Sequence, residues 1–213
     1  MTAVLFAVFA REVLSLHRAF MEARRQRRFE EAHELQAACQ VLREQLGSRL
    51  RREVEALPED RRPTAIRVCV YRVAPVGREL SPELERVTPY AVGEGGDPGE
   101  VGKRISSACG VIGLSYRTQS PQIGNRQGES IEDFRKEMIA EWGFDPDAAR
   151  TLNETRWSFL ALPIQTPEGK VDAIVFVDSE LKNCFMVDVV EWFVMPACDA
   201  MRIVIERRYG NAG

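Results

Sequence analysis

Hydrophobic residues in the first quarter of this chain follow the spacing of a helix. Residues 2–57 contain no proline and one glycine, Gly47, and they are rich in residues that favour helices. In the second half of this stretch, apolar residues recur every three or four positions, at Leu35, Cys39, Leu42, Leu46, Leu50, Val54 and Leu57. That stripe is close to a coiled-coil seam. Because an isolated helix of this kind is unstable, we expect it to pack on the rest of the chain, on a second copy, or on both.

A charged linker, residues 58–63 (PEDRRP), separates this helical segment from a region of mixed pattern. Residues 66–73 alternate as a strand does, with Ile66, Val68 and Val70 on one face and Arg67, Cys69 and Tyr71 on the other. Residues 84–92 are a second candidate strand. Residues 101–109 and 111–117 are interpreted as short helical pieces around Gly110 and Gly113, and residues 119–125 as a loop.

The last third of the chain has the strongest local signals. Residues 130–142 predict a helix, with Ser130 as its N-cap and Ile131, Phe134, Met138, Ile139 and Trp142 on one side. Residues 157–164 and 171–178 predict two strands joined by a tight turn, the clearest hairpin in the chain. Residues 186–208 have helical spacing, and we expect Pro196 to kink that helix or mark an irregular turn.

Composition narrows the chemistry mainly by exclusion. A formal net charge of −3 gives no electrostatic case for a nucleic-acid partner. The five cysteines have no CxxC spacing, which argues against a zinc site or a disulfide framework and suits a reducing cytoplasm. The two histidines, His17 and His33, both lie in the helical segment, so we expect no histidine-based metal or haem site and no cofactor.

The chain begins with a ten-residue apolar run, MTAVLFAVFA, which is too short to span a bilayer and lacks the features of a secretory signal. It is either a helix end that packs in a dimer or the end of a longer segment. We favour dimer packing. Attachment to a membrane surface is the weaker alternative, suggested by the arginines that follow the run.

Three motifs in sequence order resemble the GAF family of small sensory domains. The first is GVIGLSYRTQSP at residues 110–121, which resembles a short GxxG helix followed by Thr and Pro. The second is the strand pair SFLALPI and AIVFVDS at residues 158–164 and 173–179. The third is a C-terminal helix opened by Phe185 and Asp188. Asp172 departs from the family pattern, which has an apolar residue there.

The resemblance implies an α+β fold in which helices flank an antiparallel sheet of five or six strands. One face carries helices, and the other face, with its covering helices, encloses a pocket in members that bind small molecules. The expected domains are a helical segment at residues 1–60 and a GAF-like domain at residues 64–208. Residues 125–156 are long for the family and suggest a helical insertion like a lid. Dimerisation through the terminal helices is also implied.

Family members that carry out chemistry have features that this sequence lacks. Reductases of free methionine sulfoxide carry several cysteines in a particular loop arrangement, whereas only Cys109 lies near the pocket-forming helix here, and we expect it to be a small buried residue. Bilin binding commonly uses a Cys-His pair, and haem binding needs an axial histidine. The regulatory motif of cyclic-nucleotide phosphodiesterases is also missing. We therefore predict that the protein is not an enzyme.

If a ligand binds, polar side chains are expected to orient it and aromatic ones to close an apolar floor. Arg104 or Arg117 is a candidate to pair with a phosphate or carboxylate. The full set of predicted ligand-binding residues is Arg104, Cys109, Thr118, Ser120, Asn125, Phe134, Trp142, Trp157 and Phe159.

Two functions remain open at this point. The first is a small-molecule sensor, for a cyclic nucleotide or metabolite, that signals through the N-terminal helices to a protein partner. The second is a structural dimerisation or partner-binding module without a ligand, acting through the helical surface around residues 24–28. An empty cavity in the fold would favour the first and a filled interior the second.

Overall fold

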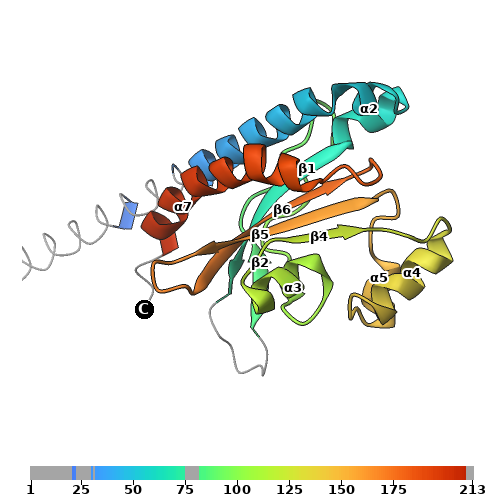
Figure 1. Ribbon diagram of the computed structural model, residues 1–213. Coiled ribbons are helices and arrows are strands. Elements are labelled where there is room, and N and C mark those ends of the chain that lie inside the picture. The colour runs from blue at the N-terminus through green and yellow to red at the C-terminus, as the bar shows by residue number, and fades with distance from the viewer. Residues whose placement is uncertain (1–20, 23–29, 31, 75–81, 210–213) are drawn as a thin grey trace, which may run out of the picture.

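The computed structural model describes residues 21–22, 30, 32–74 and 82–209, and its centre is a six-stranded antiparallel sheet. The strands lie in the order β3-β2-β1-β6-β5-β4. Their bounds are β1 (Ile66–Val73), β2 (Glu83–Arg86), β3 (Arg104–Ser106), β4 (Gln122–Asn125), β5 (Ser158–Gln165) and β6 (Val171–Ser179). Helices cover both faces (Figure 1). The expected α+β architecture is confirmed.

The strands that the sequence signalled most strongly form the middle of the sheet. β5 and β6 are the predicted hairpin, and β1 pairs with the other edge of β6, with Ile66 opposite Ser179 and Val70 opposite Val175. Most residues of β6 are buried because both of its faces are covered. Asp172, the departure from the family pattern, is the half-buried residue near its beginning.

One face of the sheet is covered by two helices that lie side by side, the N-terminal helix and α7 (Met195–Tyr209) (Figure 1). Residues 32–49 are helical, followed by α2 (Arg51–Glu55) and the 3-10 helix η1 (Glu59–Thr64). Leu35, Cys39, Leu42 and Leu46 are fully buried in one core with residues of the sheet and α7. The predicted stripe therefore packs on the chain's own sheet.

The opposite face is covered by three shorter helices: α3 (Gly110–Thr118), α4 (Ile131–Ala140) and α5 (Pro146–Arg150). Ser130 caps α4 as predicted, because its hydroxyl accepts a hydrogen bond from the Asp133 amide. α4 turns Phe134 and Met138 inward, whereas Ile131 and Ile139, expected on the same side, are exposed. The predicted lid-like insertion is thus α4, α5 and their loops.

Three local predictions are corrected by strand pairing. Residues 104–106, expected in a helical piece, form β3 and pair with β2, and residues 122–125, interpreted as a loop, form the edge strand β4. The strand expected at residues 84–92 ends at Arg86. Beyond it Thr88 offers its hydroxyl oxygen to the Val70 amide, and Pro89 has no amide hydrogen to continue the ladder.

The C-terminal helix is irregular just before Pro196, as the sequence predicted. α6 (Val187–Val189) runs into the π-helix η2 (Val190–Val194), and α7 begins one residue before Pro196. A proline cannot donate the usual helical hydrogen bond, and its ring collides with the preceding turn, so a wider turn before it relieves both problems.

Several predictions concern the N-terminal segment. The apolar run at residues 1–10, His17 and the arginines at positions 24–28 lie outside the described residues. No helix in the described part of the chain is long and apolar enough to cross a membrane. Five further expectations stay predictions: the homodimer, the protein partner, the weaker alternative of membrane attachment, the cytoplasmic location and the domain division at residues 60–64.

Candidate ligand cavity

A cavity of about 420 Å³ lies between the sheet and the helices α3, α4 and α5. Five strands contribute to its sheet wall: β1, β2, β3, β5 and β6. The other walls come from α3, α4, the segment before β5 and the segment between β2 and β3. Cavities that hold small molecules typically have volumes of about 300 to 1,000 Å³. The interior on this side of the sheet is therefore large enough for a metabolite.

Aromatic side chains make up much of the cavity lining. Phe134 comes from α4, Phe159 from β5 and Phe176 from β6, and Trp142 and Phe144 follow α4. The Trp142 ring sits close to β4 because residue 124 is a glycine. A Cβ atom there would lie 2.7 Å from a Val111 methyl group and 2.9 Å from that ring. The Trp142 indole nitrogen is buried without a hydrogen-bond partner.

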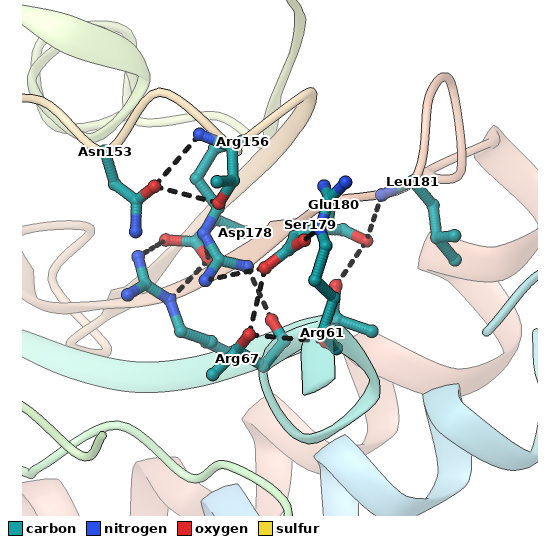
Figure 2. Close-up of polar contacts among 11 residues, drawn as sticks. Arg61, Arg67, Asn153, Arg156, Asp178, Ser179, Glu180 and Leu181 are labelled. Atoms are coloured by element: carbon teal, nitrogen blue, oxygen red, sulfur yellow. Dashed lines mark hydrogen bonds and ion pairs between the residues drawn. The ribbon is translucent and has the colours of Figure 1, made fainter. Parts of the chain in front are cut away.

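The lining also contains charged side chains, and two of them, Arg67 and Asp178, come from the central strands of the sheet. Figure 2 shows how these two side chains meet. These residues are direct neighbours across β1 and β6. Arg67 donates to both oxygens of Asp178, from Nε at 2.8 Å and from Nη2 at 2.7 Å. Burial lowers the pKa of Arg67, but the hydrogen bonds and the negative charge of Asp178 outweigh it, so the pKa is raised overall.

Arg156 extends this charged cluster away from the cavity toward η1. Its guanidinium lies 3.5 Å from Asp178 and 3.5 Å from Glu180, and Nη1 donates to the Thr64 carbonyl at 2.5 Å. Burial lowers the pKa of Arg156, and the charge of Asp178 opposes that shift only in part. Glu180 in turn accepts from Arg61 at 2.5 Å and from the Thr64 hydroxyl at 2.9 Å (Figure 2).

Arg86 brings a further positive charge to the cavity wall. The residue is 4% exposed, and its guanidinium carbon lies 4.6 Å from the centre of the Tyr90 ring. Arg67 approaches the same ring, at 4.2 Å. Nη2 of Arg86 donates to the Glu100 carbonyl, and Nε has no hydrogen-bond partner.

Cys109 borders the cavity at the start of α3, where it is the N-cap residue. It is half-buried, whereas we expected a buried residue. Its thiol donates a weak hydrogen bond to the Ser106 carbonyl at 3.6 Å. Burial raises the pKa of the thiol, and the charge of Arg117 opposes this shift. The side chain is therefore a neutral thiol at physiological pH.

Four of the nine predicted site residues line the cavity, and five do not. Those that line it are Cys109, Phe134, Trp142 and Phe159. The structure places Arg104, Thr118, Ser120, Asn125 and Trp157 elsewhere. Contact of any of the nine with a ligand stays a prediction.

The five residues outside the cavity have other neighbours. Arg104 pairs with Glu83 on the neighbouring strand at 3.1 Å. Thr118 and Ser120 are joined by a hydrogen bond of 3.0 Å, and Asn125 ends the edge strand β4. Arg117, the alternative to Arg104, donates to the Ser107 carbonyl at 2.5 Å.

Trp157 is held away from the cavity by two cations. The guanidinium of Arg126 lies 4.4 Å from the centre of the indole, and the ammonium of Lys182 lies 3.9 Å from it. Trp157 comes just before β5, two positions from Phe159, which does line the cavity. Aromatic character alone could not distinguish the two positions.

The charged residues of the cavity were missed at the sequence level. Arg67, Arg86, Arg156 and Asp178 belong to separate segments that only the fold brings together. One signal was available for two of them: Arg67 interrupts one apolar strand and Asp178 ends another, and central strands rarely bury charges without a purpose. Arg86 and Arg156 lie in segments with no comparable pattern. Within the described residues there is no cluster of acidic, cysteine and histidine side chains able to hold a metal ion.

Comparison with known proteins relates this architecture to GAF domains. No protein-family model matches the chain, and no curated protein matches its sequence. Similar solved structures include the GAF domain of a phosphoenolpyruvate-protein phosphotransferase from Coxiella burnetii, with 15% identity, coverage of 81% of this chain and 98% of that chain, and a TM-score of 0.49. Another is the GAF domain of a two-component sensor histidine kinase from Bacillus halodurans, with 11% identity, coverage of 80% and 97%, and a TM-score of 0.47.

A third similar structure corrects one prediction. It is the type II free methionine-R-sulfoxide reductase from Thermoplasma acidophilum, with 16% identity, coverage of 78% of this chain and 96% of that chain, and a TM-score of 0.45. Because an enzyme is among the structures of similar fold, the prediction that this chain is not an enzyme is contradicted. The similarity in all three comparisons is one of fold.

Proposed function

We propose that this protein is a small-molecule sensor in which a ligand in the cavity changes how the N-terminal helix is held. The support is a series of ion pairs that starts at the cavity wall and in which the carboxylates are buried. Arg156 borders the cavity and contacts Glu180, and Glu180 binds Arg61 and Thr64 of η1. A ligand that moves Arg156 therefore acts on η1, which connects the N-terminal helix to the sheet.

The expected ligand is a cyclic nucleotide or another metabolite of similar size. The cavity volume of about 420 Å³ suits such a molecule, and its lining combines aromatic and charged side chains. Binding shifts the helix only if the ligand has different affinities for two arrangements of η1. A ligand that fits the cavity only when Arg156 has moved relative to Glu180 would provide that difference.

Thermal-shift measurements against a panel of nucleotides and carboxylate metabolites test binding. Ile112 is 7% exposed and borders the cavity, so Ile112→Phe should reduce the space available and weaken the shift produced by any active compound. Ile123→Phe on β4 is the matched control, because Ile123 is 37% exposed and lies outside the cavity. If no compound raises the melting temperature of the wild type, the sensor proposal fails.

Hydrogen exchange with an active compound tests the coupling to the helix. We expect changed exchange in residues 35–64 as well as around the cavity. Thr64→Val removes one hydrogen bond to Glu180 and leaves the cavity lining intact, so it should reduce the change in the helix while the compound still binds. Changes confined to the cavity walls would contradict the coupling.

The alternative is a structural dimerisation or partner-binding module. It is favoured by apolar residues exposed along the C-terminal helices, namely Val187, which is 65% exposed, and Ile203, which is 64% exposed. Sedimentation of the wild type and of Ile203→Lys tests a second copy as the partner. A dimer that Ile203→Lys dissociates, without any ligand-induced shift, would favour this module over the sensor.

A further inference from the structure

Arg86 differs from the other buried arginines of the cavity because its charge is not balanced. Arg67 is paired with Asp178, and Arg156 lies near Asp178 and Glu180. Among the residues that the structure describes, the Arg86 guanidinium forms no ion pair with a carboxylate, although only 4% of the residue is exposed. A buried charge without a partner is costly, and folded proteins normally pair it.

The surroundings of Arg86 hold its guanidinium in one position without neutralising it. One face of the group lies against the Tyr90 ring, and Nη2 donates to the Glu100 carbonyl. Gly99 lies in the segment between β2 and β3. A Cβ atom at this position would lie 3.0 Å from Nη2 of Arg86, so the backbone passes very close to the guanidinium. Nε has no hydrogen-bond partner. The group is therefore oriented, and part of its donor capacity is unused.

The charge and the position of Arg86 indicate what would complete this site. We infer that Arg86 binds the anionic group of the cavity ligand, a carboxylate or a phosphate, while the apolar part of the ligand lies against Trp142 and Phe159. This inference rests on the proposed function, in which the cavity holds a small molecule. Guanidinium groups bind both kinds of anion through paired, charge-assisted hydrogen bonds. Arg67 is less available for this purpose because both oxygens of Asp178 already occupy it.

Three probes that share a phenyl ring separate the charge from the apolar contact: phenylacetate, phenyl phosphate and the neutral phenylacetamide. Titration calorimetry of the wild type should show about tenfold or greater preference for an anion over the amide, and the better anion identifies the head group. Arg86→Met should abolish that preference while the amide still binds. Arg150→Met is the control, since Arg150 is exposed on α5, outside the cavity, and should keep the preference.

Two results distinguish failure of this inference from failure of the proposed function. If the amide and the anions bind equally well and Arg86→Met changes neither, the cavity binds ligands but Arg86 does not select anions. If no probe and no compound of the panel binds, the sensor proposal itself fails.

Thermal stability without an organic ligand gives an independent measurement. The charge of Arg86 is unpaired, so Arg86→Met should lower the melting temperature much less than Arg67→Met does, or should raise it. Inorganic phosphate, at constant ionic strength, should stabilise the wild type more than Arg86→Met. A large loss of stability in Arg86→Met together with equal phosphate effects would overturn the inference and make Arg86 a structural cation.

Discussion

Arg67 and Asp178 lie directly opposite each other on β1 and β6, and two hydrogen bonds of 2.8 and 2.7 Å join them at the wall of the cavity. Their side chains are 14% and 3% exposed. Burying an ion pair in the middle of a sheet carries a desolvation penalty, and only well-oriented hydrogen bonds offset it. Here the geometry is bidentate, and the same carboxylate also lies 3.5 Å from Arg156.

Replacing Asp178 with asparagine should therefore destabilise the protein strongly. The substitution leaves Arg67 buried without its acidic partner, and breaking a buried pair in this way costs about 3 to 5 kcal/mol. Urea unfolding followed by circular dichroism measures the difference. Glu83→Gln, which breaks the exposed pair with Arg104, is the control and should cost less than about 1 kcal/mol. Equal losses in the two variants would contradict this view of the cluster.

The N-terminal helix should contribute to the stability of the single chain. Leu42 is fully buried in the core that includes the sheet and α7, so Leu42→Ala should reduce the free energy of unfolding by about 2 to 5 kcal/mol. Because that core lies within one chain, the loss should be the same at all protein concentrations. Val41→Ala provides a control, since Val41 is 53% exposed. A loss that grows on dilution would instead place Leu42 in a contact between chains.

Cys109 should be the first cysteine to react with iodoacetamide. It is half-buried, whereas Cys39, Cys69, Cys184 and Cys198 are buried. Only the thiolate reacts, and the raised pKa of Cys109 keeps the thiol protonated, so alkylation at pH 8 should be slower than that of free cysteine and should accelerate as the pH rises beyond 9.0. Mass spectrometry of peptides follows the site. Early labelling that persists in Cys109→Ser would show that another cysteine reacts first.

Asp172 should make the folded protein less stable at neutral pH than an uncharged residue would. Burial and the nearby Glu206 and Glu168 raise its pKa above the ordinary 3.8, so the folded state binds this proton more tightly than the unfolded state. The associated stability is present at low pH and is lost as the pH rises through the folded-state pKa. Asp172→Asn should thus raise the melting temperature at pH 7, with the gain disappearing near pH 3.8.

A gain from Asp172→Asn that is as large at pH 3.5 as at pH 7 would show that ionisation is not the cause. Asp147→Asn is the matched control at an exposed site on α5, where the side chain is 89% exposed. That substitution should change the melting temperature little at either pH.

Arg126 should hold the lid-like insertion to the domain. Its guanidinium lies 4.5 Å from the centre of the Phe134 ring and donates to four backbone carbonyls, those of Gly128, Glu129, Ser130 and Glu154. Arg126→Met should cost at least about 1.5 kcal/mol, because hydrogen bonds from a charged group are lost. It should also speed hydrogen exchange in residues 128–156 and leave α7 unaffected. Lys136→Met on α4 is the control, because the Lys136 side chain is 76% exposed. Uniform acceleration throughout the chain would contradict a local role.

The pattern of residues along the chain was sufficient to predict the elements that depend on local signals. β1, the β5–β6 hairpin and α4 with its Ser130 cap follow from periodicity, a tight turn and one side-chain hydrogen bond. Periodicity also identified the stripe from Leu35 to Leu50 but not its partner. A helix stripe shows which face is buried, and the surface that buries it is known only once distant segments are in place.

The charged part of the cavity lining was decided by the tertiary structure alone. Arg67, Arg86, Arg156 and Asp178 come from four segments, and their role depends on which charge each one meets. The same holds for β3, whose residues become a strand by pairing with β2. Trp157 and Phe159 are both aromatic and two positions apart, yet only Phe159 lines the cavity, since two cations hold Trp157 elsewhere. Local sequence sets which groups are apolar or charged, whereas pairing across the fold sets which charges are balanced and which remain for a ligand.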